Sequence, residues 1–269
     1  MYTLIIDTHI HLYRKFDLSL LLKSACENMR TYFSSSQLSG TLLPVLGLTS
    51  TPSETSWREL SEIQVSGAAI DGKGGEWQLS QTGDDTLFRA SNPMGDDVYL
   101  LRGHQLITSE KLELLVLGSE SPAYDAERGL MWHVENNLSE LMIIPWAVGK
   151  WLGPRGAIVS EVMDRYSDSI HLGDNGGRPA IWSHVKQFKE AAHSKAAIWP
   201  GTDPLPLPGQ ECTVGLNTIT VEGVKLGTLS GKDLVASLAT NNSSIITQAR
   251  RENLFGFFYN QLRLRLPVN

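Results

Sequence analysis

The sequence predicts an α/β protein folded as one distorted, TIM-like (β/α)7–8 barrel. Three observations support this fold class. The chain of 269 residues is long enough for one large barrel, strand-like and helix-like stretches alternate along most of it, and neither a linker nor an internal repeat divides it. A composition of 41% hydrophobic and 19% charged residues is typical of a folded globular chain. We therefore expect a single domain over residues 1–269.

The first elements are a buried strand and an amphipathic helix. Residues 2–6 form a short apolar run without alternation, which indicates a strand covered on both faces. A helix is expected over residues 18–32, with Asp17 as its cap and one apolar stripe. A second strand over residues 40–48 and a second helix over residues 53–66 follow.

Residues 72–103 interrupt this alternation. The segment is rich in Gly, Asp, Ser and Asn, and its strand-like pieces at 77–79 and 86–88 flank a Gly-Asp-Asp turn. We interpret the segment as a β-rich excursion from the barrel. Two more β pieces are expected on either side of residues 109–111.

The strand–helix rhythm returns in the second half of the chain. We expect helices at residues 125–138, 155–165, 183–194, 231–238 and 245–264, and strands at residues 141–148, 169–172 and 196–199. Because these units recur at short spacing, they favour a parallel barrel over separate domains.

Charge and composition limit the classes of partner. A formal net charge of −6 argues against non-specific nucleic-acid binding, which needs a basic surface. No stretch approaches the roughly 18 apolar residues of a membrane span, and the N-terminus does not resemble a signal peptide. Cys26 and Cys212 are far apart and are expected to be reduced thiols. We expect a cytoplasmic protein that acts on a small, possibly anionic molecule, without a nucleic-acid or membrane partner.

The segment Asp7-Thr8-His9-Ile10-His11, at the end of the first strand, suggests metal chemistry. Side chains at i and i+2 share one face of a strand, so Asp7, His9 and His11 are predicted to point the same way. Imidazole nitrogens bind divalent ions, and a nearby carboxylate can ligate or orient them. The alternative is that both histidines are ordinary polar residues at a strand end.

This segment resembles the start of the polymerase-and-histidinol-phosphatase (PHP) family, and it is similar to the wider amidohydrolase superfamily. The segment 102–106 (Arg-Gly-His-Gln-Leu) resembles the PHP strand that carries a metal-bridging Glu, here replaced by Gln105. The segment 200–203 (Pro-Gly-Thr-Asp) resembles the late motif that supplies a ligand Asp, here Asp203. The resemblance implies a (β/α) barrel in which bound divalent metals activate water.

The sequence departs from the PHP pattern at three places. Gln105 is a neutral ligand, the strand end at 144–146 (Ile-Pro-Trp) has no imidazole, and Pro204 and Leu205 follow Asp203 where PHP proteins usually carry a His two residues on. We therefore expect a reduced site that holds one or two ions of Zn, Mn or Fe.

His171 and Asp174 are further candidate ligands. They follow a predicted strand and could lie at the same barrel mouth. The alternative is that residues 174–177 (Asp-Asn-Gly-Gly) form a simple turn, for which Asn-Gly is a strong signal.

Three basic residues could bind an anionic substrate group. Lys150 and Arg155 flank the start of a predicted helix, where backbone N–H groups also favour anions, and Arg178 lies on the next loop. The alternative is that all three are solvated loop charges. Four tryptophans near predicted strand ends could wall a pocket or plug the barrel: Trp146, Trp151, Trp182 and Trp199.

The leading hypothesis from the sequence is a metal-dependent hydrolase that attacks a phosphoester with an activated water. His9 and His11 would hold the ion, Asp203 would complete the site or act as general base, and the basic residues would stabilise negative charge. Two alternatives are a barrel that binds a ligand or partner without turnover and an amidohydrolase that cleaves a C–N bond.

Overall fold

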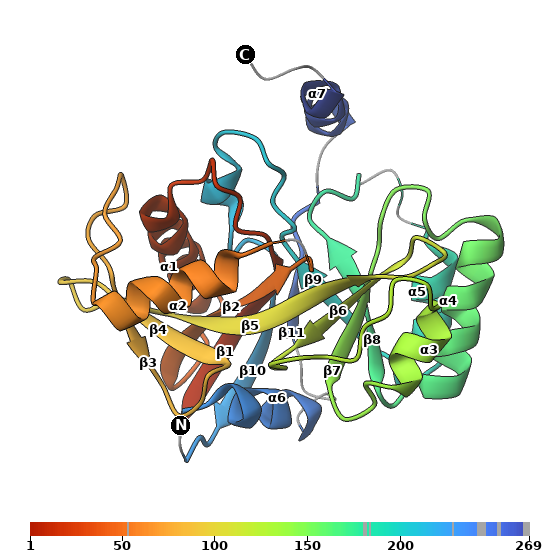
Figure 1. The fold of residues 1–269 in the computed structure, drawn as a ribbon, viewed down its shortest axis with the longest axis horizontal. Coiled ribbons are helices and arrows are strands. Elements are labelled where there is room, and N and C mark those ends of the chain that lie inside the picture. Colours follow the sequence, from red (N-terminus) through yellow and green to blue (C-terminus); the bar gives the residue numbers. More distant parts are fainter. Residues whose placement is uncertain are drawn as a thin grey trace.

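The computed structural model describes residues 1–52, 54–179, 182, 184–227, 229–240, 246–251 and 254–265. Within them, one sheet of eleven strands curls into a nearly closed, barrel-like shape (Figure 1). The strands are β1 (Tyr2–Ile10), β2 (Thr41–Ser50), β3 (Gln78–Gln81), β4 (Leu87–Ser91), β5 (Asp97–Ile107), β6 (Glu113–Leu117), β7 (Leu141–Pro145), β8 (Ile170–Asn175), β9 (Ile198–Gly201), β10 (Thr218–Val224) and β11 (Ile246–Gln248).

The strand order is β11-β10-β1-β2-β5-β6-β7-β8-β9, and the β3–β4 hairpin extends from β5. Strands β1, β2 and β5 pair in parallel, as do β7, β8 and β9. Strand β6 is antiparallel to both of its neighbours, and β10 is antiparallel to β1 and β11. The carboxyl ends of β1, β2, β5, β7, β8, β9 and β11 therefore meet at one end of the barrel, which we call the mouth.

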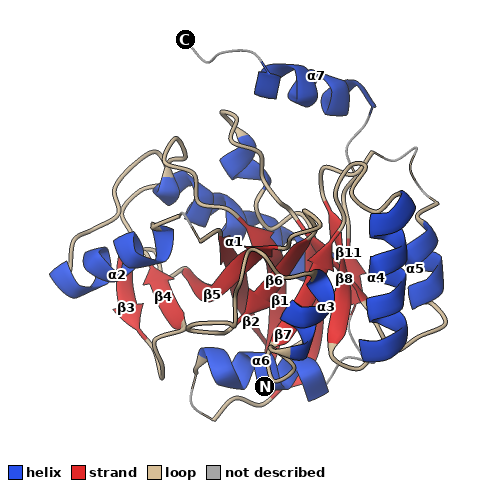
Figure 2. Cartoon of the chain, turned by 45° about the vertical axis from the view of Figure 1, so that its right-hand side comes forward, coloured by secondary structure: helices blue, strands red, loops and turns tan. Residues whose placement is uncertain are grey.

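The helices are α1 (Leu18–Ser35), α2 (Ser56–Ser66), α3 (Leu130–Glu135), α4 (Gly153–Tyr166), α5 (Lys186–Ala191), α6 (Gly231–Thr240) and α7 (Leu254–Arg265), with a short 3-10 helix at Gln210–Thr213. Helices α1 and α2 pack on the outer face of β1, β2 and β5. Helices α3, α4 and α5 cover β6, β7 and β8, and Figure 2 shows α4 and α5 side by side on that face.

The observed architecture confirms the α/β class but not a regular (β/α)7–8 barrel. Three strands, β4, β6 and β10, run against the rest, and fewer helices than strands surround the sheet in the part of the chain that the structure describes. The excursion predicted at 72–103 contains the β3–β4 hairpin, but it also contains most of β5, which is a central strand. The local pattern does not reveal the central position of β5, because turn residues precede this strand and its parallel partner β2 lies far back in the chain.

The C-terminal region also differs from its predicted pattern. One helix was expected over residues 245–264, but the structure has β11 at Ile246–Gln248 and α7 at Leu254–Arg265, while residue 245 lies outside the described residues. Strand β10, which the sequence pattern did not reveal, pairs with both β1 and β11. Strand pairing over long sequence separations thus overrides local helix character.

The barrel interior is a closely packed apolar core. Alternate residues of the strands point inward, among them Leu4 and Ile6 of β1 and Val45 of β2. Helix α6 closes the end opposite the mouth, where Leu234 and Leu238 are fully buried against these strands. Figure 1 shows α6 across that end, near the N-terminus, and α7 beyond the mouth. The described interior cluster is thus apolar and closely packed.

Replacing Leu234 with alanine is expected to lower the free energy of unfolding by about 2–5 kcal/mol, because a fully buried leucine leaves a cavity when it is truncated. Urea unfolding measures this loss. Val65→Ala, at a side chain that is 82% exposed, is the control and should change stability by less than about 0.5 kcal/mol. Equal effects of the two substitutions would contradict the role of α6 as the closure of the barrel.

Among the described residues, no helix has both the length and the apolar character needed to cross a membrane.

Candidate metal centre

His9 and His11 lie at the mouth, where β1 ends, and their side chains meet Gln105 of β5. The Nε2 atoms of the two histidines are 3.1 Å apart, and each lies 3.0 Å from the Gln105 Oε1. All three residues are buried. The structure thus brings together three potential ligand atoms from two parallel strands.

Asp203 supplies a fourth ligand atom from the segment that follows β9. Its Oδ1 lies 3.7 Å from the His9 Nε2 and 3.9 Å from the His11 Nε2. The Asp203 N–H donates to the His9 carbonyl at 2.8 Å, which fixes this segment against β1. Asp203 has a φ of 48°, a left-handed conformation that is uncommon for residues other than glycine and often marks a functional position.

Gly201 allows this close approach of β9 to β1. A Cβ atom at Gly201 would lie 2.6 Å from the His9 Cβ and 3.0 Å from the His9 backbone nitrogen. Neither atom can move without moving β1. A glycine is therefore required where the two strands bring His9 and Asp203 together.

His9, His11 and Asp203, with Gln105 beside them, could hold a metal ion. Ligands about 2.0–2.1 Å from a tetrahedral ion lie about 3.3 Å from one another, and the separations of 3.0–3.9 Å bracket that value. Two imidazole nitrogens, an amide oxygen and a carboxylate oxygen are a donor set that suits a divalent transition metal. A single ion matches this number of ligands.

The outer nitrogens of both histidines face acceptor oxygens. His9 Nδ1 lies 3.4 Å from the Asn175 Oδ1, and His11 Nδ1 lies 3.8 Å from a Glu54 carboxylate oxygen. A proton on Nδ1 leaves Nε2 as a lone pair, so the two Nε2 atoms and the Gln105 oxygen would face one another as three acceptors. A positive charge between them relieves that repulsion.

The pKa values of the two histidines respond to these surroundings in opposite directions. Burial lowers the pKa of His9 and outweighs the opposing charge of Asp203. Burial acts in the same direction on His11, but Glu54 and the charge of Asp203 together raise the pKa of His11 above its usual value. His9 is therefore the more readily available neutral ligand.

Asn175 is a positioning residue that the sequence pattern did not reveal. Its Nδ2 donates to the Asp203 Oδ2 at 2.8 Å and to the Trp146 carbonyl at 2.9 Å, while its Oδ1 faces His9. It therefore connects the ligands on β1 and after β9. The alternative that residues 174–177 form a simple turn holds only in part, because Asn175 is the last residue of β8 and the turn begins after it.

Asp7 does not join the ligands, contrary to the prediction. The pairing of β1 with β2 shifts between Asp7 and Ile10, so three steps on β1 match two on β2 and the alternation of faces is broken. The Asp7 carboxylate accepts hydrogen bonds from the Thr202 hydroxyl and from the N–H groups of Thr202 and Gly215. Burial raises the pKa of Asp7 to about 7 despite these bonds. Asp7 thus fixes the loops around the site.

Asp174 and Arg178 form a buried ion pair instead of serving as a ligand and a substrate-binding group. The Arg178 Nε and Nη2 each donate to an Asp174 carboxylate oxygen at 2.6 Å, and Arg178 also donates to the Trp182 carbonyl. The guanidinium lies over the ring of Phe188 on α5. The pair joins β8 to α5. The structure therefore corrects the predictions of Asp174 as a metal ligand and of Arg178 as a substrate-binding residue.

His171 also lies apart from the ligand group. Its ring stacks on Trp199 with 4.0 Å between centroids, and its Nδ1 accepts a hydrogen bond from the Ala197 N–H. Burial lowers the pKa of His171 to about 4. His171 is therefore a neutral, packed side chain of the barrel and not a ligand.

This low pKa predicts a pH-dependent loss of stability. The folded chain resists protonation of His171 between pH 6.5 and about 4 while the unfolded chain accepts the proton, so stability is complete above pH 6.5 and falls as the pH is lowered through that window. The drop in pKa corresponds to about 3 kcal/mol. Urea unfolding from pH 7.5 to 4.5 should show a smaller loss in His171→Gln than in wild type. The exposed His193→Gln is the control; parallel curves for wild type and His171→Gln would contradict the assignment.

Lys150 and Arg155 have different positions. The Lys150 Nζ lies 2.5 Å from a carboxylate oxygen of Glu113, which pairs with Ile107 at the carboxyl end of β5, so Lys150 lies near the mouth. Arg155 lies in the first turn of α4 and donates to the Gly149 carbonyl at 3.1 Å. Arg155 therefore supports a loop on the outer side of the barrel and lies outside the ligand group.

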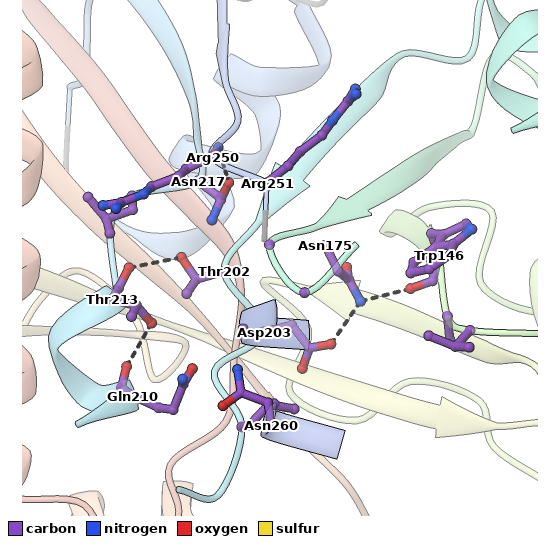
Figure 3. Close-up of a pocket in the computed structure, with 17 residues that line it drawn as sticks. Trp146, Asn175, Thr202, Asp203, Gln210, Thr213, Asn217, Arg250, Arg251 and Asn260 are labelled. Carbon is purple, nitrogen blue, oxygen red and sulfur yellow. Dashed lines mark hydrogen bonds between the residues drawn. The ribbon is translucent and has the colours of Figure 1, made fainter. Parts of the chain in front are cut away.

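A cavity of about 530 Å³ adjoins Asp203 at the mouth (Figure 3). Its lining includes Arg250 and Arg251, which follow β11 and which the sequence pattern placed within a helix. Asp203 lines this cavity, whereas His9 and His11 are not among its described lining residues. The one signal in the sequence was the Arg-Arg pair itself, in a chain of net negative charge.

The four tryptophans were predicted either to wall a pocket or to plug the barrel, and they differ in position. Trp146 lines the cavity and lies 5.7 Å from Trp182 between ring centroids. Trp199 is buried inside the barrel, and Trp151 packs in the outer core beside Phe188. Only Trp146 therefore contributes to the wall of this cavity.

Fold and site together define an α/β protein with a nearly closed, barrel-like sheet and a histidine–carboxylate group that could hold a metal ion. No protein-family model and no curated protein matches the chain. The crystal structure of PsfC from Pseudomonas syringae PB-5123 is similar in fold, with a TM-score of 0.50 over 98% of this chain and 100% of PsfC, at 13% sequence identity. At this identity the similarity concerns the fold alone.

Proposed function

We propose that the protein is a hydrolase that depends on one divalent ion of Zn, Mn or Fe and acts on a phosphoester. The observation that carries this proposal is the convergence of His9, His11, Gln105 and Asp203 at the mouth of the barrel, beside a cavity of about 530 Å³. The order of these residues along the chain is also the basis for proposing a distant relationship to the PHP family.

A divalent ion held by these residues would act as a Lewis acid and lower the pKa of a bound water to near neutrality. The residues of the chain account for the rest of the chemistry. Asp203 is 29% exposed and borders the cavity, so its carboxylate can accept a proton from an attacking water. Asn175 holds that carboxylate in place. Arg250, Arg251 and Lys150 supply positive charge near the mouth for a phosphate group.

Gln105 favours a second candidate function. A neutral amide is a weaker ligand than the Glu expected from the PHP resemblance, so the barrel could retain the site and bind a ligand or partner without turnover. Hydrolysis of a C–N bond uses the same metal chemistry and is the third possibility.

Metal-dependent turnover distinguishes these functions. Protein stripped with chelator and reconstituted with Zn²⁺, Mn²⁺ or Fe²⁺ is assayed on p-nitrophenyl phosphate, bis(p-nitrophenyl) phosphate and p-nitroacetanilide. We expect phosphoester hydrolysis that requires the metal and is lost in Asp203→Asn, with Asp168→Asn, an exposed carboxylate, as the control. Hydrolysis of the anilide alone would indicate a C–N hydrolase. Metal binding without any turnover would support the binding protein and contradict the hydrolase.

A further inference from the structure

The cavity beside Asp203 carries positive charge that the metal group does not explain. Among its described lining residues, the charged ones are Asp203, Arg250 and Arg251. Two arginines against one carboxylate give this lining a net positive charge even when no ion is bound to Asp203. The cavity therefore has a positive field that selects anions.

The backbone of Arg250 is fixed to the barrel. Strand β11 pairs with β10 through Thr218 and Gln248, and the Arg250 N–H donates to the Asn217 Oδ1 at 2.6 Å. Asn217 is buried and packs against the turn after β8, where a Cβ at Gly176 would lie 2.6 Å from the Asn217 Nδ2. Arg250 therefore starts from a rigid point at the mouth.

The two arginine side chains have different surroundings. Arg251 lies 3.8 Å from Asp174, whose carboxylate also pairs with Arg178. No ion pair of the Arg250 guanidinium occurs within the described part of the chain. In Figure 3 the two side chains leave the backbone in opposite directions, with Arg250 on the side of Thr213. Arg250 therefore has fewer nearby carboxylates than Arg251 that would compete with a bound anion.

The rest of the wall suits the uncharged part of a small molecule. Trp146, Leu205 and Leu216 supply apolar surface, while Asn260 of α7 adds an amide. A volume of about 530 Å³ lies within the usual range of small-molecule sites. Apolar surface with one charged anchor is a typical arrangement for a ligand that has an apolar body and one anionic group.

We propose that this cavity binds a small molecule that carries an oxyanion, a phosphate monoester or a carboxylate, on an apolar or aromatic body, and that Arg250 is the residue that recognises the oxyanion. The proposal rests on the proposed function in one respect: the bound molecule would be the substrate of the metal centre. Recognition of the anion itself does not require the metal.

The test is isothermal titration calorimetry of the full chain in chelator at low ionic strength. The probes are phenyl phosphate, benzoate and phenol, which share a ring and differ in charge. We expect phenyl phosphate, benzoate or both to bind more tightly than phenol, and the tighter of the two identifies the oxyanion. Arg250→Gln should weaken that binding by about tenfold, since it removes a charged hydrogen-bond donor. Arg251→Gln should have a smaller effect, because Arg251 already faces Asp174.

Arg165→Gln is the matched control, because Arg165 lies in the last turn of α4 and pairs with Glu161. It should bind the probes as wild type does, and Arg250→Lys should retain part of the affinity. Equal affinity for phenol and both anions, or unchanged anion affinity in Arg250→Gln, would overturn the proposal. Because chelator removes any metal, loss of the proposed hydrolase activity would not alter these results, and the two proposals can fail separately.

Discussion

Replacing His9 with alanine is expected to lower the affinity for Zn²⁺ by more than about 100-fold, because loss of a direct ligand costs at least as much as loss of a residue that only orients one. The His9 Nε2 lies within 3.7 Å of the ligand atoms of His11, Gln105 and Asp203, so its removal opens the group on one side. Competition titration against a fluorescent zinc chelator measures the change.

His104→Ala is the matched control for this substitution. His104 precedes Gln105 on β5, and its Nε2 donates to the Ser119 carbonyl outside the ligand group. It should therefore retain the wild-type zinc affinity. His9→Gln, which keeps a polar side chain of similar length, guards against an effect of misfolding, and circular dichroism should show folded protein for all variants. Unchanged zinc affinity in both His9 variants would remove His9 from the site.

Replacing Arg178 with methionine is expected to lower the free energy of unfolding by about 3–5 kcal/mol, because it leaves the buried Asp174 carboxylate without its main partner. Arg251, 3.8 Å from Asp174 and partly exposed, can replace only part of that interaction. Zinc affinity should stay unchanged, since the Arg178 guanidinium bonds to Asp174 and Trp182 and not to a ligand residue. Urea unfolding and zinc titration of the same variant measure the two quantities.

The double variant Asp174→Asn with Arg178→Met is expected to recover part of the lost stability, because it removes the unpaired charge. Arg165→Met breaks an exposed ion pair with Glu161 and should cost less than about 1 kcal/mol. An Arg178→Met protein of wild-type stability that had lost phosphoester hydrolysis would restore Arg178 to a role in substrate binding and contradict its structural role.

Local sequence could indicate that the candidate ligands lie at or near the ends of strands. His9, His11, Gln105 and Asp203 follow or end apolar runs, and in the structure the carboxyl ends of their strands meet at the mouth. Asp7 was misplaced because the irregularity between Asp7 and Ile10 depends on pairing with β2, which local sequence does not reveal.

The parts that sequence could not indicate depend on contacts between distant segments. Strands β10 and β11 are defined by pairing with each other and with β1, so a helical interpretation of residues 245–264 placed Arg250 on the wrong element. Arg178 follows a strand like a substrate-binding residue, but burial against α5 commits it to Asp174. The alternation of predicted strands and helices indicated the α/β class. It did not indicate that β6 and β10 run antiparallel to their neighbours.

The central claim is that His9, His11, Gln105 and Asp203 bind one divalent ion. Anomalous diffraction at the zinc edge from crystals soaked in Zn²⁺ tests it most directly. We expect one strong peak about 2.0–2.2 Å from the His9 Nε2, the His11 Nε2 and the Asp203 Oδ1, with the Gln105 Oε1 beside it. Absence of a peak among these atoms, at a zinc concentration that fills other surface sites, would contradict the claim.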